Sequence, residues 1–320
     1  MKTVEFPHMT VAWVIQQFID AMNGVNGSRP VKPLGTSHLY TLQNLQRSAL
    51  GAIRADKLTE DDIRDHAEVR IRTVAPATVN HDIGYLHGAL KYVRAARRDC
   101  KGIIAHVIPD VRPFLVKNGY VSKSVARTRR PTDDEIERLL AYFAVQPKIM
   151  AENYIYAMQD IIAFALVSSR RRGEICRITH SDIDWNHKDE QGNPAPMYLV
   201  RKMKHPTKKD HQKRFPLFPE LAEIILRQPR KPGDDRIFPF NPRSVGAAYT
   251  RAKQALGIEN LRFHDNRREA ITNWLKKLSP HQVRHFVSGH DSVKMIESNY
   301  DATNPADGHA LIRHAVEVRP

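Results

Sequence analysis

Cysteine is scarce in this sequence, which has only two cysteines in 320 residues. Cys100 and Cys176 lie far apart and form no CxxC pair, which argues against a disulfide scaffold. This scarcity is typical of a reducing compartment, where structural disulfides are rare. We therefore expect a cytoplasmic protein.

Long apolar segments are also missing. The longest apolar run, YIYAMQDIIAFALVSS, contains Gln159 and Asp160 and is too short and too polar to span a bilayer. The N-terminal MKTVEFPHMT lacks the basic segment and the apolar core of a signal peptide. No internal repeat or low-complexity tract is present. A composition of 41% hydrophobic and 27% charged residues is typical of a soluble globular protein.

Acidic residues are in deficit. Asp and Glu number 35 against 50 Lys and Arg, which leaves a formal net charge of +15 and a pI of about 9.9. Such an excess attracts polyanions, and nucleic acid is the commonest of them. An anionic membrane surface, or a charge that serves solubility, would give the same balance, so the motifs must decide.

Residues 1–118 are predicted to form a helical domain, because two segments carry apolar residues at helical spacing. These apolar faces comprise Val11, Val14, Phe18 and Met22 in the first segment and Ile83, Leu86, Leu90 and Val93 in the second. Lys91, Arg94 and Arg98 share a basic face of the second segment. That face is either solvated surface or a contact surface for DNA.

Residues 119–131 are predicted to be an exposed basic linker between two domains. The stretch KNGYVSKSVARTRRP, which includes it, holds five basic residues, no acid and no helical apolar stripe. Its charge suits a strap along DNA phosphates. The predicted DNA contacts here are Lys123, Arg127, Arg129 and Arg130.

The second domain, residues 132–320, is expected to open with a helix, because Thr132 and Glu135 form a capping-box pattern ahead of an apolar run. Farther on, MYLVRKMK and KRFPLF are strand-like and flank a polar turn. Helical patterns return from Leu221 and from His264. The predicted fold class is therefore mainly α with a small antiparallel β-sheet.

The first candidate site motif is FALVSSRRRGEICRITHSDID. Here an apolar helix ends in Arg170, Arg171 and Arg172, which is either a charged surface cap or an anion site. The guanidinium fork binds phosphate in a bidentate manner. Glu174, one turn beyond Arg171, is placed to hold a neighbouring cation.

The second motif is RFHDNRREA, where His264 and Arg267 are spaced i and i+3 and so share a helical face. A proton-transfer group beside a permanent cation suits chemistry at a phosphate. Surface pairs of His and Arg are nevertheless common, so this motif alone is weak.

The third motif, SGHDSVKMIESNY, places His290 after a glycine and ends at Tyr300. Val293, Ile296 and Tyr300 also have the spacing of a buried helical face, which is the alternative role for the tyrosine. A phenol with an ordinary pKa of about 10 is a poor nucleophile at neutral pH. Surrounding cations would lower that pKa and would also neutralise a phosphate under attack.

The order of these motifs resembles that of the tyrosine recombinase, or lambda-integrase, family. The motifs are Arg-x-x-Glu, a lysine in a hairpin, His-x-x-Arg, Gly-His and a final Tyr. The resemblance covers roughly residues 130 to 302, and THSDID matches the segment that usually follows the Arg-x-x-Glu motif in that family. The N-terminal helical region is similar in size and position to the core-binding domain of that family. Before Arg171 the family usually has Thr, Gly and an apolar residue, whereas this chain has Ser168, Ser169 and Arg170. The tyrosine also lies one residue farther from His290 than in many members.

The resemblance implies a role for each residue. Tyr300 would attack a DNA phosphate to give a 3′-phosphotyrosyl bond and a free 5′-hydroxyl, without metal, ATP or any other cofactor. Arg171 and Arg267 would clamp the phosphate oxygens, with Glu174 in support; His264 would manage protons and His290 would donate to the phosphate. A hairpin lysine would act as general acid for the leaving oxygen. Lys204, near the end of the incoming strand, is favoured, and Lys208, at a spacing before FPL seen in members with shorter hairpins, is the alternative.

The resemblance also implies partners: double-stranded DNA with short inverted core sites, gripped by a two-domain clamp, and a homo-tetramer that works through a Holliday junction. PADGHALIRHAVEV would form a helix that docks on a neighbouring protomer. Accessory DNA-bending proteins are compatible with this scheme, and the bound enzyme would be associated with the nucleoid. Because the predicted core-binding helices begin almost at the first residue, we expect no N-terminal arm-binding module. Whether it integrates or excises a mobile genetic element, or resolves multimers, stays open.

Three alternative hypotheses about the function remain. A type IB topoisomerase shares this chemistry without strand exchange, and a non-cutting DNA-binding protein would share the charge and the fold. A metal site is the third, since His281, His285 and His290 lie close together in HQVRHFVSGH. No cysteine is near them and no glutamate lies between the first two histidines, so no metal is expected.

Overall fold

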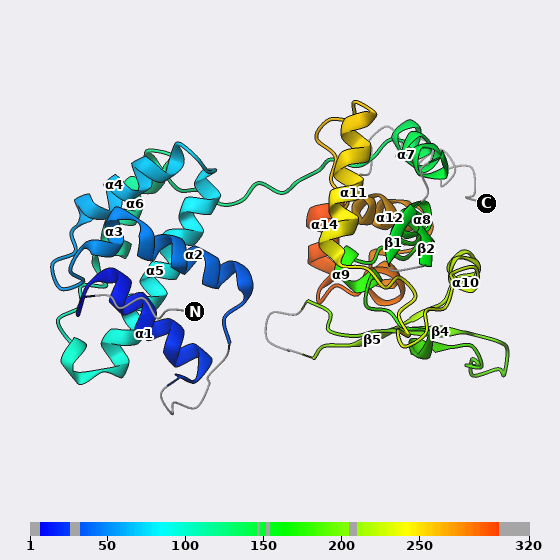
Figure 1. Cartoon of the computed structure of the whole chain (residues 1–320), viewed down its shortest axis with the longest axis horizontal. Coiled ribbons are helices and arrows are strands. Elements are labelled where there is room, and N and C mark those ends of the chain that lie inside the picture. The colour runs from blue at the N-terminus through cyan, green and yellow to red at the C-terminus, as the bar shows by residue number, and fades with distance from the viewer. Residues whose placement is uncertain (1–6, 26–32, 146–147, 152–153, 205–209, 301–320) are drawn as a thin grey trace, which may run out of the picture. The chain divides into compact units, whose positions relative to one another are not determined.

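The computed structural model of the chain describes residues 7–25, 33–145, 148–151, 154–204 and 210–300. It divides into two compact units, Met1–Val125 and Ala126–Pro320 (Figure 1). The division falls inside the segment 119–131 that the sequence predicts to be a linker. The two units are described separately below.

Every helix or strand assigned in the described part of the first unit is a helix. Its helices are α1 (Val11–Asn23), α2 (Thr36–Arg47), α3 (Ala49–Ala52), α4 (Glu60–Ile71), α5 (Pro76–Ala96), the short 3₁₀ turn η2 (Arg98–Cys100) and α6 (Val107–Lys117). Local chemistry sets several of their ends. The Thr10 hydroxyl accepts from the Trp13 N–H at the start of α1, and Gly24, with φ of 73°, ends that helix. Proline at the first position opens α5.

The core of the first unit forms where α1 and α2 pack on α5. The apolar faces that the sequence predicts are both buried, including Val14 in α1 and Leu86 and Leu90 in α5. Each fully buried side chain of this size contributes roughly 1.5–3 kcal/mol to stability. The amphipathic spacing thus accounts for how these helices assemble.

The second unit combines helices with two small sheets. Its elements are α7 (Asp133–Val145), β1 (Lys148–Ala151), β2 (Tyr154–Ala157), α8 (Met158–Ser168), α9 (Arg172–Ile175), η3 (His180–Asp182), β3 (Ile183–Asp184), β4 (Met197–Val200), β5 (Lys213–Pro216), α10 (Pro219–Leu226), α11 (Pro242–Ala255), α12 (Asp265–Leu275), α13 (Pro280–Gln282), the π-helix η4 (Val283–Ser288) and α14 (Val293–Tyr300). The predicted capping box opens α7. The Glu135 N–H donates to the Thr132 hydroxyl over 3.2 Å, and the Glu135 carboxylate accepts from the Thr132 N–H over 2.9 Å.

A three-stranded antiparallel sheet has the order β3–β4–β5. Tyr198 of β4 pairs with Ile183 on one side and with Phe215 on the other. The two strands predicted from the sequence are therefore confirmed, and the short β3 extends them. A separate hairpin, β1–β2, precedes α8 and was not predicted.

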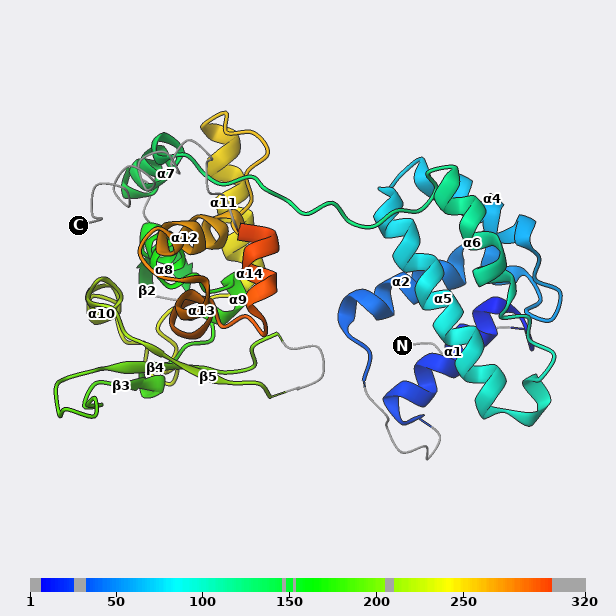
Figure 2. The ribbon, with the colours of Figure 1, turned by 180° about the vertical axis from the view of Figure 1, so that it is seen from behind.

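α8 is the centre of the second unit, with α12 packed along it (Figures 1 and 2). Phe164 of α8 meets the rings of Phe238 and Tyr198 edge to face, at centroid distances of 5.8 and 6.4 Å. This packing fixes the C-terminal end of α8 and the N-terminal half of α12, from which the site is built. Among the described residues, no helix is both long and apolar enough to cross a membrane.

Candidate active site

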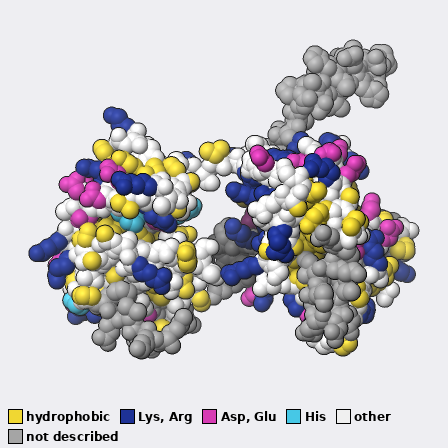
Figure 3. All heavy atoms as spheres, turned by 45° about the horizontal axis from the view of Figure 1, so that its top comes forward, with side chains coloured by type: hydrophobic (Ala, Val, Ile, Leu, Met, Phe, Trp, Pro, Cys, Tyr) yellow, Lys and Arg dark blue, Asp and Glu magenta, His cyan; other side chains and the backbone are white. Residues whose placement is uncertain are grey.

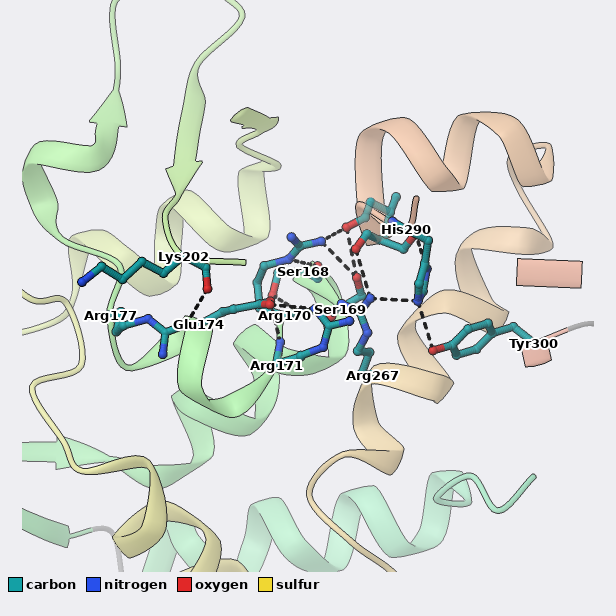
Figure 4. A network of polar contacts seen from close by, with 12 residues as sticks. Ser168, Ser169, Arg170, Arg171, Glu174, Arg177, Lys202, Arg267, His290 and Tyr300 are labelled. Carbon is teal, nitrogen blue, oxygen red and sulfur yellow. Dashed lines mark hydrogen bonds and ion pairs between the residues drawn. The ribbon is translucent and has the colours of Figure 1, made fainter. Parts of the chain in front are cut away.

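The site begins at a sharp turn after α8. Ser169 has a φ of +56°, a left-handed conformation that glycine adopts more readily, and the family pattern has glycine at this position. The Ser168 hydroxyl accepts from the Arg170 N–H over 3.2 Å and stabilises the turn. Because of this reversal, consecutive arginines point in different directions (Figure 4).

Arg171 is held by Glu174, as the Arg-x-x-Glu spacing predicts. Its Nη1 lies 2.8 Å from Glu174 Oε1, and its backbone N–H donates to Glu174 Oε2 over 3.0 Å. Burial alone would raise the pKa of Glu174, but the guanidinium groups of Arg170, Arg171 and Arg267 outweigh it and hold that pKa below its ordinary value. The carboxylate therefore stays ionised and fixes both the backbone and the side chain of Arg171.

Arg170 is buried, with 1% of its surface exposed. Its guanidinium carbon lies 3.9 Å above the centre of the Phe215 ring, its Nε donates to the Ser168 carbonyl, and its Nη2 donates to the Val287 carbonyl. Arg171 keeps 29% of its side chain exposed. The more accessible Arg171 is therefore better placed to meet a substrate, in agreement with its register to Glu174.

Arg267 of α12 ties three segments together. Its Nη1 donates to the Ser169 carbonyl over 2.5 Å, and its Nη2 donates to the Ser288 carbonyl over 3.0 Å and to His290 Nε2 over 3.2 Å. Its Nε–H is buried and finds no acceptor among the described residues. Burial, with the nearby cations Arg171 and Arg170, lowers the pKa of Arg267 to about 10, so the side chain is still charged at neutral pH.

His290 is presented by the π-helix η4 and by Gly289, whose φ is +68°. Arginine has only donors, so the contact with Arg267 makes Nε2 of His290 an acceptor. The proton is then on Nδ1, which donates to the Ser288 hydroxyl at 2.8 Å. Burial, reinforced by Arg267 and Arg171, lowers the pKa of His290 to about 3 and keeps the imidazole neutral.

Tyr300 lies at the end of α14 with its hydroxyl 3.4 Å from His290 Nε2 (Figure 4). It is 9% exposed and packs with Ile271, Val283 and Ile296. Tyr300 therefore belongs to the buried face of α14 and also lies beside His290. The Arg268 guanidinium lies 4.9 Å from the centre of its ring.

His264 is the N-terminal cap residue of α12 and is exposed. Protein atoms desolvate part of its ring, and this, together with Arg267 and Arg171, lowers its pKa despite the opposing charge of Asp265. His264 borders a cavity of about 520 Å³. The other lining residues are mostly arginines: Arg170, Arg171, Arg172, Gly173, Arg177, Pro242, Arg262 and Phe263. A cavity with this lining suits an anion.

The hairpin lysines are placed only in part. Lys204 is exposed and follows Met203, whose N–H pairs with the His211 carbonyl over 2.7 Å. Lys208 lies outside the described residues. Lys213 of β5 is half-buried, and burial, aided by Arg284 and Arg170, lowers its pKa. The choice of Lys204 over Lys208 stays a prediction.

The basic residues predicted to contact DNA fall into two groups. Lys91, Arg94, Arg98 and Lys123 are exposed, and Lys and Arg side chains stand out on the drawn face of both units (Figure 3). The predicted shared helical face is wrong for Arg98, because α5 ends at Ala96 and Arg98 lies in η2 after the extended Arg97. The three arginines of the predicted strap instead contact carboxylates of the second unit. These contacts are Arg127 with Asp265, Arg129 with Glu135 and Arg130 with Glu269. Their role at DNA stays a prediction.

Three contributors to the site were not singled out from the sequence. Arg268 covers the Tyr300 ring, Ser288 orients His290, and Asp265 receives Arg127. Of these, only Arg268 had a signal, its place directly after Arg267. His281 and His285 have ring centroids 4.8 Å apart, but no group of three or more metal-binding side chains occurs among the described residues.

Comparison with protein families gives one match, to the model described as the phage integrase family, over residues 129–307. A putative integrase/recombinase of Haemophilus influenzae is 26% identical over 282 residues, which are 84% of this chain and 68% of that protein. The shufflon-specific DNA recombinase of Escherichia coli is 25% identical over 268 residues. The match covers 81% of this chain but only 62% of the E. coli protein.

Two solved structures share the fold. A lambda integrase dimer bound to a COC′ core site superposes with a TM-score of 0.67 at 17% identity, covering 92% of this chain and 97% of that one. The Tn1549 transposon integrase in complex with transposon right-end DNA gives a TM-score of 0.61 at 14% identity, covering 96% of this chain and 99% of that one. The mainly helical fold with a small antiparallel sheet is therefore confirmed.

Proposed function

The chain belongs to the phage integrase family, and from this premise we propose that it is a site-specific DNA recombinase with Tyr300 as its nucleophile. The observation that carries the proposal is the placing of the Tyr300 hydroxyl 3.4 Å from His290, whose Nε2 also contacts Arg267. Arg267 also donates a hydrogen bond to the Ser169 carbonyl, in the sharp turn that precedes Arg171. Tyr300, His290 and Arg267 thus form one chain of hydrogen bonds, and Arg171 and His264 line the arginine-rich cavity.

In the proposed first step, Tyr300 Oη attacks a backbone phosphorus and the bond from phosphorus to the 5′-oxygen breaks. The product is a 3′-phosphotyrosyl link and a free 5′-hydroxyl. Arg171 and Arg267 bind the non-bridging oxygens, where negative charge grows in the transition state. In the second step a 5′-hydroxyl from the other duplex attacks the link and releases Tyr300. The phosphodiester energy is conserved, so the two steps balance without ATP.

The two histidines divide the proton work. An imidazole with a pKa of about 3 is too weak a base to keep the proton of a phenol, so His290 orients the Tyr300 hydroxyl. Its Nδ1–H donates to Ser288, so it can donate to the phosphate, as the resemblance implies, only once Nε2 carries a proton. His264 is exposed at the cavity, and its lowered pKa keeps it neutral at neutral pH and able to accept a proton. A hairpin lysine, Lys204 or the alternative Lys208, protonates the leaving 5′-oxygen.

We also propose that recombination takes place in a tetramer on two duplexes with short inverted core sites. The support is a likeness of fold: a lambda integrase tetramer bound to a Holliday junction superposes with a TM-score of 0.63 at 16% identity. The helical first unit and residues 119–131 would contact the duplex, with Lys91, Arg94, Arg98 and Lys123 as exposed cations. The segment predicted to dock on a neighbour, PADGHALIRHAVEV, lies outside the described residues.

The first experiment incubates the purified protein with DNA from around its own gene, in EDTA and without ATP, and scores adducts that survive SDS. We expect the wild type to form an adduct and Tyr300→Phe, which loses one hydroxyl from a packed ring, to fold normally and form none. An adduct that persists in Tyr300→Phe would mean that another residue is the nucleophile. Tight, salt-sensitive binding with no adduct from either protein would favour a non-cutting DNA-binding protein.

A further inference from the structure

The predicted strap does not lie free of the second unit. Arg127 is half-buried and forms a bidentate ion pair with Asp265, with Nε to Oδ1 and Nη2 to Oδ2 both at 2.8 Å. The same guanidinium reaches Asn260, bonding its side-chain oxygen at 2.9 Å and its carbonyl. Asp265 keeps only 2% of its side chain exposed. This is a built contact with every guanidinium nitrogen engaged.

A second pair repeats the arrangement one helical turn later. Arg130 Nη1 lies 3.2 Å from Glu269 Oε2, and Glu269 keeps 8% of its side chain exposed. Asp265 and Glu269 are spaced i and i+4, so they share one face of α12. At about 100° per residue, Arg267 falls on the opposite side of the helix axis, while His264, the cap residue just before α12, lies about 100° from Asp265. The strap therefore contacts α12 on the side away from Arg267.

We propose that Arg127 and Arg130 are positioning residues for the reaction, which hold α12 so that His264 and Arg267 face the phosphate. The proposal rests on the recombinase function given above. Asp265 also accepts from the backbone N–H of Arg262, a residue that lines the arginine-rich cavity. The grip therefore extends from the chain segment next to the first unit, through Asp265, to the wall of the cavity.

The competing role for these arginines is direct binding of DNA phosphates. Moving Arg127 to a phosphate would leave the buried Asp265 carboxylate without its partner, and an unpaired buried charge is strongly destabilising. Lys123, in contrast, is exposed. The two roles predict different measurements, because a phosphate ligand sets affinity and its salt dependence whereas a positioning residue sets the rate after binding.

The experiment measures single-turnover cleavage of a saturated protein–DNA complex, together with the Kd and its salt slope. We expect Arg127→Gln to cleave roughly ten- to a hundredfold more slowly, since small misplacements of catalytic groups cost rates of that order. The Kd should stay within about threefold, with the salt slope unchanged. Asp265→Asn should slow cleavage similarly, and its effect should not add to that of Arg127→Gln in the double variant. Arg130→Gln and Glu269→Gln should behave as a second, weaker pair.

Three further variants calibrate the assay. Arg138→Gln removes an arginine of α7 that pairs with Asp134 and donates to the Leu256 carbonyl, and not to a carboxylate of α12, so it should leave rate and affinity unchanged. Lys123→Gln should weaken binding and lower the salt slope without slowing cleavage of the saturated complex. Arg127→Lys should retain part of the rate, because an ammonium keeps the charge and one of the two hydrogen bonds to Asp265.

The outcomes separate the hypotheses. If Arg127→Gln weakens binding, lowers the salt slope and cleaves at the wild-type rate once saturated, Arg127 is a phosphate ligand and the positioning role is wrong. A full rate in Asp265→Asn would overturn the role in the same way. If Asp265→Asn does not fold, the comparison of Arg127→Gln with Arg127→Lys still decides. Failure of the wild type to cleave any DNA would instead refute the proposed function.

Discussion

At the scale of single residues, the neutral imidazole of His290 sets the hydrogen-bond directions of the site. Its Nε2 accepts from Arg267 and from the Tyr300 hydroxyl, and its Nδ1–H donates to the Ser288 hydroxyl. A protonated imidazole would have no acceptor and would repel Arg267. The local arrangement and the protonation state therefore depend on each other.

This dependence predicts a loss of stability in mild acid. The pKa of His290 is about 3 when folded and near its ordinary 6.5 when unfolded, so the unfolded chain binds more protons between these values. Stability is then lost as the pH falls below 6.5. Between pH 7.5 and pH 5, the wild type should lose about 2 kcal/mol more than His290→Asn, measured by urea unfolding. His264 and the other histidines titrate in both proteins and cancel. Equal pH dependence in the two proteins would show that His290 is protonated in the fold.

The general acid is a second question at this scale. If Lys204 is the acid, Lys204→Ala should lose at least about a hundredfold in cleavage rate on normal DNA. It should recover on DNA whose 5′-bridging oxygen is replaced by sulfur, because a thiolate leaves without a proton. Lys208→Ala is the comparison that decides between the two lysines, and Lys202→Ala is the matched control from the same hairpin. Recovery in Lys208→Ala alone would make our preference for Lys204 wrong.

The pairing of Arg171 with Glu174 could be predicted at residue scale because a short spacing within one turn decides its geometry. The burial of Arg170 could not be. Its partners, Phe215 and the Val287 carbonyl, are brought to it by β5 and η4 from distant parts of the chain. A local pattern of three arginines does not reveal which one turns inward.

At the scale of elements, the turn between η4 and α14 depends on the hairpin beneath it. A Cβ on Gly289 would lie 2.7 Å from Met203 Cε and 2.8 Å from Phe215 Cζ. Phe215 is itself buried under Arg170, so its ring has little room to move. The sheet and the His290 turn therefore act as one packed block.

Gly289→Ala should destabilise this block by about 2–3 kcal/mol, from the left-handed φ and the two close contacts together, and should slow cleavage. Gly257→Ala is the matched control. Gly257 has a φ of +66°, but no described heavy atom lies within 4 Å of its added Cβ, so only the conformational cost of about 1–2 kcal/mol should appear. Chemical unfolding and single-turnover cleavage test both variants. Equal losses would show that contacts with the hairpin do not matter.

The sequence is informative about elements where periodicity is long or capping is strong. The α5 face, the start of α7 and the β4–β5 pair follow from such patterns. The β1–β2 hairpin could not be predicted in this way. YIYA runs directly into the apolar α8, and a short apolar run is compatible with either a strand or a helix. The single π-helix turn before His290 likewise depends on tertiary packing and has no signature of its own.

At the scale of the whole molecule, the net charge of +15 makes DNA affinity depend on salt. If Lys91, Arg94 and Arg98 each neutralise one phosphate, replacing all three by Gln should lower the slope of log affinity against log salt by about 2–3. Arg97→Gln is the control, since that guanidinium already pairs with Asp99 and stacks on Trp13. Filter-binding titrations over a range of salt measure the slopes. An unchanged slope in the triple variant would show that these three cations face solvent and not DNA.

The strap also has a consequence for building chimeras. The capping box marks Thr132 as the natural place to join a catalytic unit to a foreign DNA-reading unit. A junction there would leave Arg127 and Arg130 on the discarded piece and strip Asp265 and Glu269 of their partners. Exchanging whole units between relatives should therefore succeed when the graft begins between Val125 and Ala126. Lineages that shuffle these units would be expected to inherit positions 127, 130, 265 and 269 together.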